Sequence, residues 1–199
     1  MLDDVARSDL LTLARASIAH AFAHSRRPRA GELLASSSPA LDQHMGAFVT
    51  LTIAGRLRGC IGEIVARRPV SEAVADRACA AAFDDPRFAP LQPGELVRLR
   101  IEISALHPPE RVDQVDAIEP GRHGVVLHHG PAGAVFLPQV APEQGWTREQ
   151  MLSHLSAKAG LPSDAWRHPR TWFEVFEAEV FGEEPRPAPR AAGDPDCTA

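Results

Sequence analysis

Apolar residues return at helical spacing in three stretches of the chain. Between about residue 9 and residue 24 they form a stripe that predicts a helix with one face on a core: Leu11, Ala14, Ile18 and Phe22. A second helix is predicted over 69–86, with Ser71 as its N-cap and Pro86 as its stop. A third begins at Thr147, with the spacing of a capping box, and ends at Gly160.

Alternation of apolar and polar residues predicts the strands. Residues 47–53 and 57–64 each alternate and read as half-buried strands. Residues 96–104 alternate most regularly, with one face made of Val97, Leu99, Ile101 and Ile103. Two short strands joined by a turn are predicted over 124–140, and one last strand over 171–181.

The first two strands are predicted to form a hairpin around a three-residue loop at 54–56. This register sets Thr50 opposite Cys60 and Thr52 opposite Arg58, and it keeps the apolar residues of both strands on one face. A two-residue loop would place an arginine against a leucine. The hydrophobic pattern therefore favours the longer loop, with Arg58 and Cys60 side by side on the polar face.

The order of these elements is helix, hairpin, helix, strand, hairpin, helix, strand. It lacks the regular alternation of strands and helices that builds a parallel sheet, so we predict an α+β fold with a mostly antiparallel sheet and flanking helices. Residues 182–199 are rich in proline and alanine and are predicted to be a disordered tail.

Composition narrows the class of protein. The chain has 199 residues, 44% of them hydrophobic, and a formal charge of −5 without a block of basic residues. The charge therefore argues against a nucleic-acid partner. The first residues are acidic where a secretory signal is basic, and the longest apolar stretch is too short to span a bilayer. We expect a cytoplasmic protein without a membrane partner.

Cys60 is the residue with the most distinctive surroundings. It stands between Gly59 and, two places on, Gly62, with Arg58 just before them. Cysteine reacts as its thiolate, which a nearby arginine stabilises, and glycines leave the backbone open to a ligand. The alternative is a buried cysteine that acts as a small hydrophobic residue in a strand interrupted by glycines. The threonines on the same face, including Thr50, bring the two interpretations close to even.

A nucleophilic thiol needs a base, and two candidates stand out. His123 lies between two glycines, where the backbone can present a side chain at an edge, although the same residues also suit a simple turn. Glu102 lies on the polar face of the strand at 96–104. Asp85 and Arg87 flank a proline and either contact a polar substrate or hold the end of the second helix by an ion pair.

Other chemistries find little support in the sequence. The three cysteines lack C-x-x-C spacing, and adjacent histidines at 128 and 129 point to opposite faces of a strand. The dinucleotide-binding, Walker A, zincin and nucleophile-elbow motifs are all missing from the sequence. We therefore predict no metal site and no cofactor.

Several segments together resemble one family. In order they are "GAFVTL", "LRGCIGEI", "DDPRF", "ELVRLRIEIS", "PGRHGVVL", "FLPQVAPEQGW" and "KAGLPSDAW". They are similar to the AMMECR-one domain family, whose bacterial branch is called AmmeMemoRadiSam system protein A. The resemblance covers residues 8–181, and the "LRGCIG" hexapeptide is its most specific part.

The resemblance implies one α+β unit with a larger and a smaller lobe and a cleft between them near the hexapeptide. It also implies two working partners, a Memo-like protein and a radical-SAM protein, but it names no reaction. The family's motif positions carry over to eight residues of this chain: Arg58, Gly59, Cys60, Gly62, Asp85, Arg87, Glu102 and Gly124.

Two hypotheses of function follow. In the first, the protein is a thiol-dependent enzyme component in which Cys60 is the nucleophile or covalent carrier. Arg58 stabilises its thiolate or binds a carboxylate, and His123 or Glu102 moves protons. Its substrate, small or carrier-bound, would contact Gly59, Gly62, Thr50, Asp85 and Arg87. In the second, the protein is a non-catalytic adaptor for the same partners, and the hexapeptide is a structural hairpin with a recognition edge.

Overall fold

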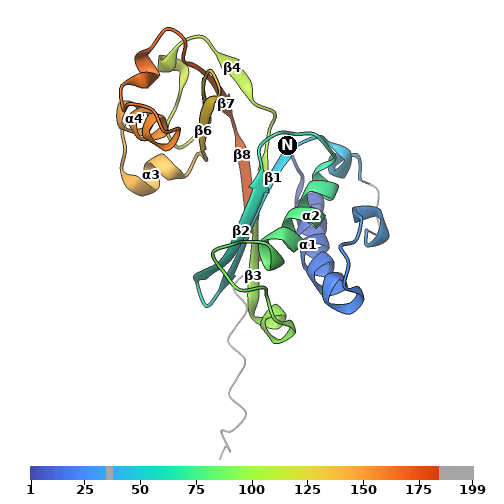
Figure 1. Cartoon of the computed structure of the whole chain (residues 1–199). Helices are drawn as coiled ribbons and strands as arrows, with labels where there is room; N and C mark the ends of the chain where they lie inside the picture. The colour runs from blue at the N-terminus through green and yellow to red at the C-terminus, as the bar shows by residue number, and fades with distance from the viewer. Residues whose placement is uncertain (35–37, 184–199) are drawn as a thin grey trace, which may run out of the picture.

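Two four-stranded antiparallel sheets form the framework of the protein, one in each of two lobes (Figure 1). The computed structural model describes residues 1–34 and 38–183. The predicted α+β class with mostly antiparallel strands and flanking helices is confirmed. Most of the predicted tail lies outside the described residues, and Gly182, its first residue, pairs with Glu102 of the sheet.

The larger lobe holds the first sheet and two long helices. Its strand order is β2-β1-β3-β8. The strands are β1 (Gly46–Ile53), β2 (Arg56–Glu63), β3 (Leu99–Leu106) and β8 (Ala178–Gly182). The helices are α1 (Asp4–His24) and α2 (Val70–Phe83), and both cover the same face of the sheet (Figure 1).

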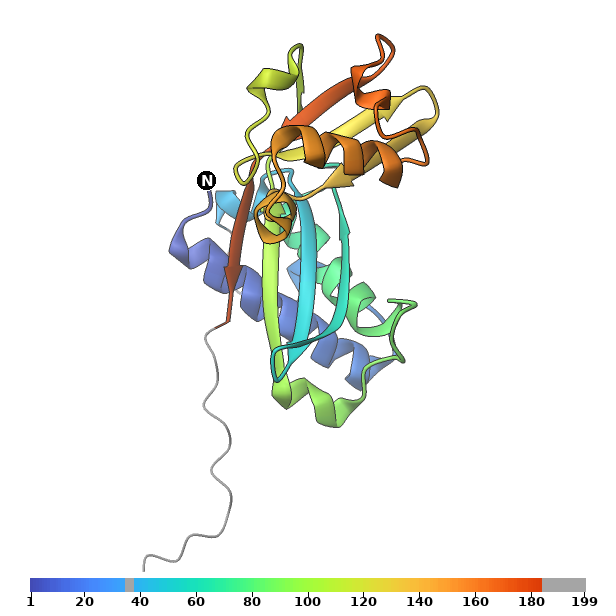
Figure 2. The ribbon, with the colours of Figure 1, turned by 90° about the vertical axis from the view of Figure 1, so that its left-hand side faces the viewer.

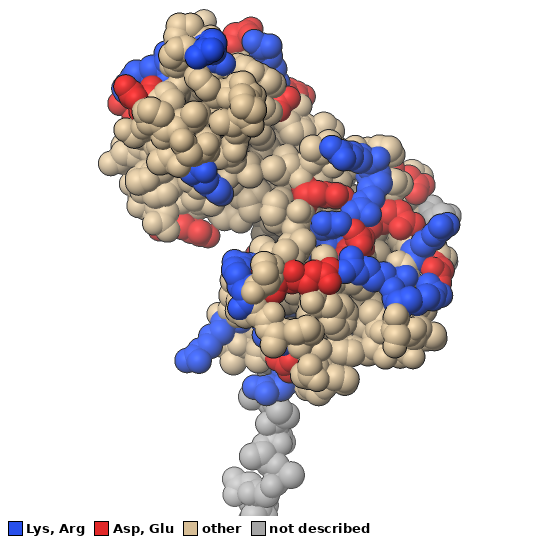
Figure 3. Space-filling model, viewed as in Figure 1, with Lys and Arg blue, Asp and Glu red and all other residues tan. Residues whose placement is uncertain are grey.

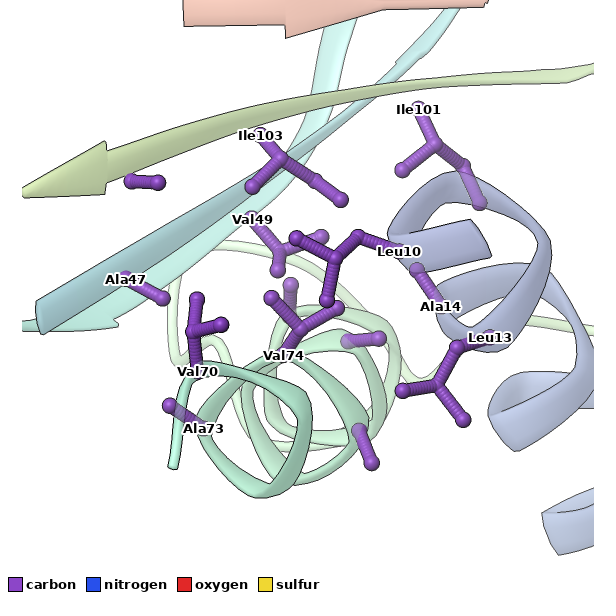
Figure 4. Close-up of a cluster of buried hydrophobic side chains, with 14 of the residues drawn as sticks. Leu10, Leu13, Ala14, Ala47, Val49, Val70, Ala73, Val74, Ile101 and Ile103 are labelled. Atoms are coloured by element: carbon purple, nitrogen blue, oxygen red, sulfur yellow. The ribbon is translucent and has the colours of Figure 1, made fainter. Parts of the chain in front are cut away.

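Alternating residues of the strands meet the two helices in the core of this lobe. Val49 and Ile103 are fully buried, as are Leu10 of α1 and Val74 of α2 (Figure 4). Because α2 is rich in alanine on this side, it can lie close to the sheet. Among the described residues, no helix of this lobe lies on the opposite face of the sheet, which is turned toward the viewer in Figure 2 and is called the open face below.

The smaller lobe holds the second sheet, in the order β4-β7-β5-β6. Its strands are β4 (Glu110–Val112), β5 (Gly124–His129), β6 (Ala132–Phe136) and β7 (Trp172–Phe176). Its helices are α3 (Val140–Gln144) and α4 (Arg148–Lys158). The predicted capping box of α4 is present, since Thr147 accepts from the backbone N–H of Gln150 and Gln150 accepts from that of Thr147.

Within the described residues the chain crosses between the lobes twice, and one crossing interrupts a predicted strand. The single strand predicted over 171–181 is two strands, β7 and β8, which separate at Glu177 and belong to different sheets. The other crossing joins β3 to β4. Figure 3 shows the surface hollowed between the lobes on the left, beneath the smaller lobe.

Three predicted boundaries were wrong, each for a local reason. Helix α1 begins at Asp4, because the side chain of Asp3 caps it by accepting from a backbone N–H. Ser71 is not the N-cap of α2 but lies buried in its first turn. Val97 is 68% exposed and precedes β3, because residues 93–98 form a 3₁₀ helix instead of extending the strand.

Candidate functional site

The hairpin that carries the hexapeptide is tighter than predicted and contains a bulge. Ala54 and Gly55 form a two-residue turn with positive φ values of 50° and 74°, the combination found in type I′ turns. The register shifts between Leu51 and Thr52, so that Arg58 is an extra residue in β2. Thr50 lies opposite Cys60, as predicted, whereas Thr52 lies opposite Leu57 and not Arg58.

The backbone of Cys60 is held by the segment that follows α2. Its N–H donates to Asp85 Oδ2 at 2.8 Å, and its carbonyl accepts from Arg87 Nη2 at 3.3 Å. Asp85 in turn accepts from the backbone N–H and the guanidinium of Arg87. Asp85 and Arg87 therefore occupy the free edge of β2 at the position where a further strand would pair.

Asp85 is a buried carboxylate with a full set of donors. Its side chain is 2% exposed, whereas that of Arg87 is 55% exposed. The guanidinium of Arg87 and the backbone N–H groups of Cys60 and Arg87 lower the pKa of Asp85 far below its usual range, against the opposing effect of burial. The carboxylate therefore stays ionised and holds Cys60 in place.

The side chain of Cys60 projects onto the open face of the larger sheet. Because its N–H and C=O point outward to Asp85 and Arg87, Cys60 and Thr50 form a non-hydrogen-bonded pair, in which side chains come closest. The Thr50 hydroxyl donates to Cys60 Sγ at 3.3 Å. On the other side of Thr50, Glu102 of β3 occupies the same row and is exposed.

Arg58 is not directed at the thiol of Cys60. Its Nε and Nη2 donate to the two carboxylate oxygens of Glu95 at 2.8 and 2.9 Å. The bulge at this position explains the difference, because it takes Arg58 out of the strict alternation that the sequence suggested. Arg87, for which the sequence left open a substrate contact or a local ion pair, forms the ion pair with Asp85 and also contacts the Cys60 backbone.

The glycines of the hexapeptide have a packing role that the sequence did not reveal. A Cβ on Gly59 would collide with the backbone carbonyl of Ala81 in α2, and one on Gly62 would enter the ring of Phe48. The expectation was that these glycines leave the backbone open to a ligand. At the positions where a side chain would begin, the space is instead filled by Ala81 and Phe48. Gly124 is similar, since the ring of Phe176 covers it.

His123 lies at the junction of the lobes and not beside Cys60. Its Nδ1 accepts from the backbone N–H of Glu119. It lines a cavity of about 390 Å³ together with residues from both crossings, among them His107 and Glu177. His123 takes no part in the polar contacts of Cys60, which are made with Thr50, Asp85 and Arg87. The structure thus groups Cys60, Thr50, Asp85 and Arg87, places Glu102 near them, and leaves His123 apart.

The described residues contain neither a candidate metal cluster nor a helix that could span a membrane. Within 1–34 and 38–183, no three or more His, Cys, Asp and Glu side chains are grouped so that they could hold a metal ion. Over the same ranges, no helix combines the length and the apolar character needed to cross a bilayer. Cys79 is buried in α2, and burial raises the pKa of its thiol to about 11.

The fold and the hexapeptide hairpin define a two-lobed α+β domain with a thiol on an open sheet face. The AMMECR1 family model matches residues 11–181, and the chain belongs to this family. The predicted family is thereby confirmed.

Archaeal proteins of known sequence and structure are similar to this chain over most of its length. Protein MK0488 of Methanopyrus kandleri is 39% identical, over 88% of this chain and 87% of its own. Protein TK0174 of Thermococcus kodakarensis is 40% identical, over 88% and 89%. The crystal structure of the uncharacterized protein PH0010 from Pyrococcus horikoshii superimposes with a TM-score of 0.79 at 36% identity, over 88% and 90% of the two chains. These names state no activity.

Proposed function

We propose that this protein is a thiol-dependent enzyme component in which Cys60 is the nucleophile or the covalent carrier. The observation that carries the proposal is the setting of its sulfur, which accepts from the Thr50 hydroxyl at 3.3 Å on an open sheet face. A buried cysteine that only fills space needs neither a donor to its sulfur nor two charged residues on its backbone. By family resemblance, the enzyme works with a Memo-like protein and a radical-SAM protein.

Before its sulfur can act as a nucleophile or a covalent carrier, the Cys60 thiol must lose its proton. Glu102 is the better placed proton acceptor, because it shares a cross-strand row with Thr50 and Cys60, whereas His123 lies at the lobe junction. Arg87, with more than half of its side chain exposed, is available to an anionic group of the substrate.

The first test is the rate at which iodoacetamide alkylates each cysteine at pH 7, followed by mass spectrometry. Cys60 is expected to react at least about tenfold faster than Cys79, which is buried and fully protonated at this pH. Thr50→Val removes the donor to sulfur and should slow alkylation of Cys60 by a few fold, whereas Thr52→Val, on the same face, should leave it unchanged.

The second test asks whether the thiol matters in the cell. In a strain that lacks the wild-type gene, Cys60→Ser should abolish formation of the pathway product while leaving the amount of folded protein unchanged. Unchanged product with Cys60→Ser would refute the proposal, and so would a Cys60 that alkylates as slowly as Cys79.

A second candidate function is the non-catalytic adaptor, favoured by apolar side chains on the larger sheet. Leu57 of β2 is 42% exposed and Val180 of β8 is 51% exposed. The edge of β2 is a poor docking site at Cys60, because Asp85 and Arg87 already occupy it. Leu57→Asp should then abolish co-purification with the partners, and Cys60→Ser should not. The enzyme proposal instead expects Cys60→Ser to abolish the pathway product and Leu57→Asp to leave it unchanged.

A further inference from the structure

A concavity in the smaller lobe lies apart from the Cys60 site. Strand β4 pairs with β7 only from Glu110 to Val112, opposite residues 175–173. Beyond Val112 the chain leaves β7, while Trp172 continues to pair with His128 of β5. The two diverging segments enclose about 660 Å³. This volume lies within the range of about 300–1,000 Å³ that is usual for small-molecule sites.

Arg111 and Trp172 line the concavity and belong to a row of planar side chains on three neighbouring strands, whose third member, His128, lies outside the lining. The ring of His128 lies parallel to the indole of Trp172, at 3.8 Å between centroids and 9° between planes. The guanidinium carbon of Arg111, from β4, lies 5.1 Å from the centre of the same indole. His128 is fixed in turn by Glu174 at 2.8 Å. Trp172 is thus held rigidly, and Arg111 forms the end of the row.

A second pair of a guanidinium and an indole lines the same concavity. Arg167 lies 4.0 Å over the ring of Trp166, whose Nε1–H donates to Ser153. The ion pair of Arg167 with Glu149 is 3.5 Å long and joins two exposed side chains, so it contributes little. A guanidinium that lies over an indole can still offer its outer side for stacking and its N–H groups for hydrogen bonds.

The charges around the concavity favour an anion at Arg111. Within the described part of the chain, Arg111 has no carboxylate at ion-pair distance, and its recorded contact is with Trp172. Two carboxylates line the same space. Asp116 is neutralised by Arg148 at 2.8 Å, whereas Asp113 carries no such partner among the described side chains. The site therefore offers two arginines to an anion and one carboxylate to a hydroxyl or amino group.

We infer that this concavity binds a small anion that carries a flat aromatic ring, the chemistry of a mononucleotide. The ring stacks on the guanidinium planes, the phosphate bonds to the edges of Arg111 and Arg167, and Asp113 accepts from a sugar hydroxyl or a ring amino group. The inference does not depend on the chemistry of Cys60, because every residue that carries it belongs to the smaller lobe.

The test is a titration of the full chain with AMP, followed by tryptophan fluorescence. The chain has three tryptophans. Trp166 and Trp172 line the concavity, whereas Trp146 stacks on His154 elsewhere. We expect a saturable change with AMP and at least about tenfold weaker binding of adenosine and of ribose 5-phosphate, since each lacks half of the contacts. No saturable change up to about 10 mM AMP overturns the inference.

Variants locate the binding. Arg111→Ala should weaken AMP binding about tenfold, and Arg111→Lys by less, since it keeps the charge but loses the planar fork. Arg98→Ala, an exposed arginine of the larger lobe, is the matched control and should have no effect. Unchanged affinity with Arg111→Ala overturns the inference. So does a short oligoribonucleotide that binds more than about a hundredfold tighter than AMP, because the ligand would then be a polymer.

Discussion

Replacing Gly59 by alanine tests whether the hexapeptide is built for packing against α2. A Cβ at this position would lie 3.0 Å from the carbonyl carbon of Ala81 and closer still to its oxygen, whereas ordinary contacts are 3.4 to 4 Å. The obstacle is helix backbone, which cannot turn aside as a flexible side chain can. Helix α2 or strand β2 must therefore move. Overpacking of this kind usually costs about 1–3 kcal/mol, and we expect Gly59→Ala to lie near the upper end.

For a chain of this length, about 3 kcal/mol corresponds to a melting temperature lower by roughly 6–12 °C. Thermal and urea unfolding followed by circular dichroism measure it directly. Gly94→Ala is the matched control, because a Cβ there meets nothing within 4 Å, and its free energy of unfolding should stay within about 0.5 kcal/mol of wild type. If Gly59→Ala were equally harmless, the packing explanation of this glycine would be refuted.

Three further predictions concern single contacts. The pKa of Asp85 is lowered in the folded state, so its negative charge stabilises the fold at pH values above the ordinary pKa of about 3.9. The difference in free energy of unfolding between wild type and Asp85→Asn should therefore shrink as the pH falls below about 4. A difference that stays constant from pH 6 to pH 2 would contradict this. Thr147→Ala removes the cap of α4 and should cost about 1 kcal/mol in urea unfolding. Glu95→Gln weakens the bidentate pair with Arg58 and should lower the free energy of unfolding by about 1 kcal/mol, while the alkylation rate of Cys60 stays unchanged. A changed rate would mean that Arg58 does influence the thiol.

Local patterns in the sequence were sufficient to predict the class of the fold. Alternation identified β1, β5 and β6, and the capping box marked the start of α4. What alternation could not show is which sheet a strand joins. Residues 171–181 contain no glycine or proline that would mark a break, yet the chain passes from one sheet to the other at Glu177. That change is decided by long-range packing of both lobes, for which a continuous strand pattern carries no signal.

The candidate site was predicted in part. The pairing of Thr50 with Cys60 followed from the hydrophobic pattern, because a register shifted by one residue would have exposed the core face. The partnership of Arg58 with Glu95 could not be foreseen, since the bulge that redirects Arg58 arises from the tight turn at Ala54. The contacts of Asp85 with Cys60 join residues 25 positions apart and leave no periodic trace.

The same contacts of Asp85 and Arg87 have a second consequence, because β2 is an edge strand of its sheet. Unpaired N–H and C=O groups on such an edge are a template for pairing with another chain.

The double variant Asp85→Ala and Arg87→Ala frees both groups of Cys60 and leaves its side chain on the open face. We expect its average mass in sedimentation to rise with concentration more steeply than that of wild type. Arg87→Ala alone keeps the carboxylate on the N–H and is the matched control. If the double variant, shown by circular dichroism to be folded, sediments as wild type does at every concentration, these two residues act only to hold Cys60 in place and do not protect the edge.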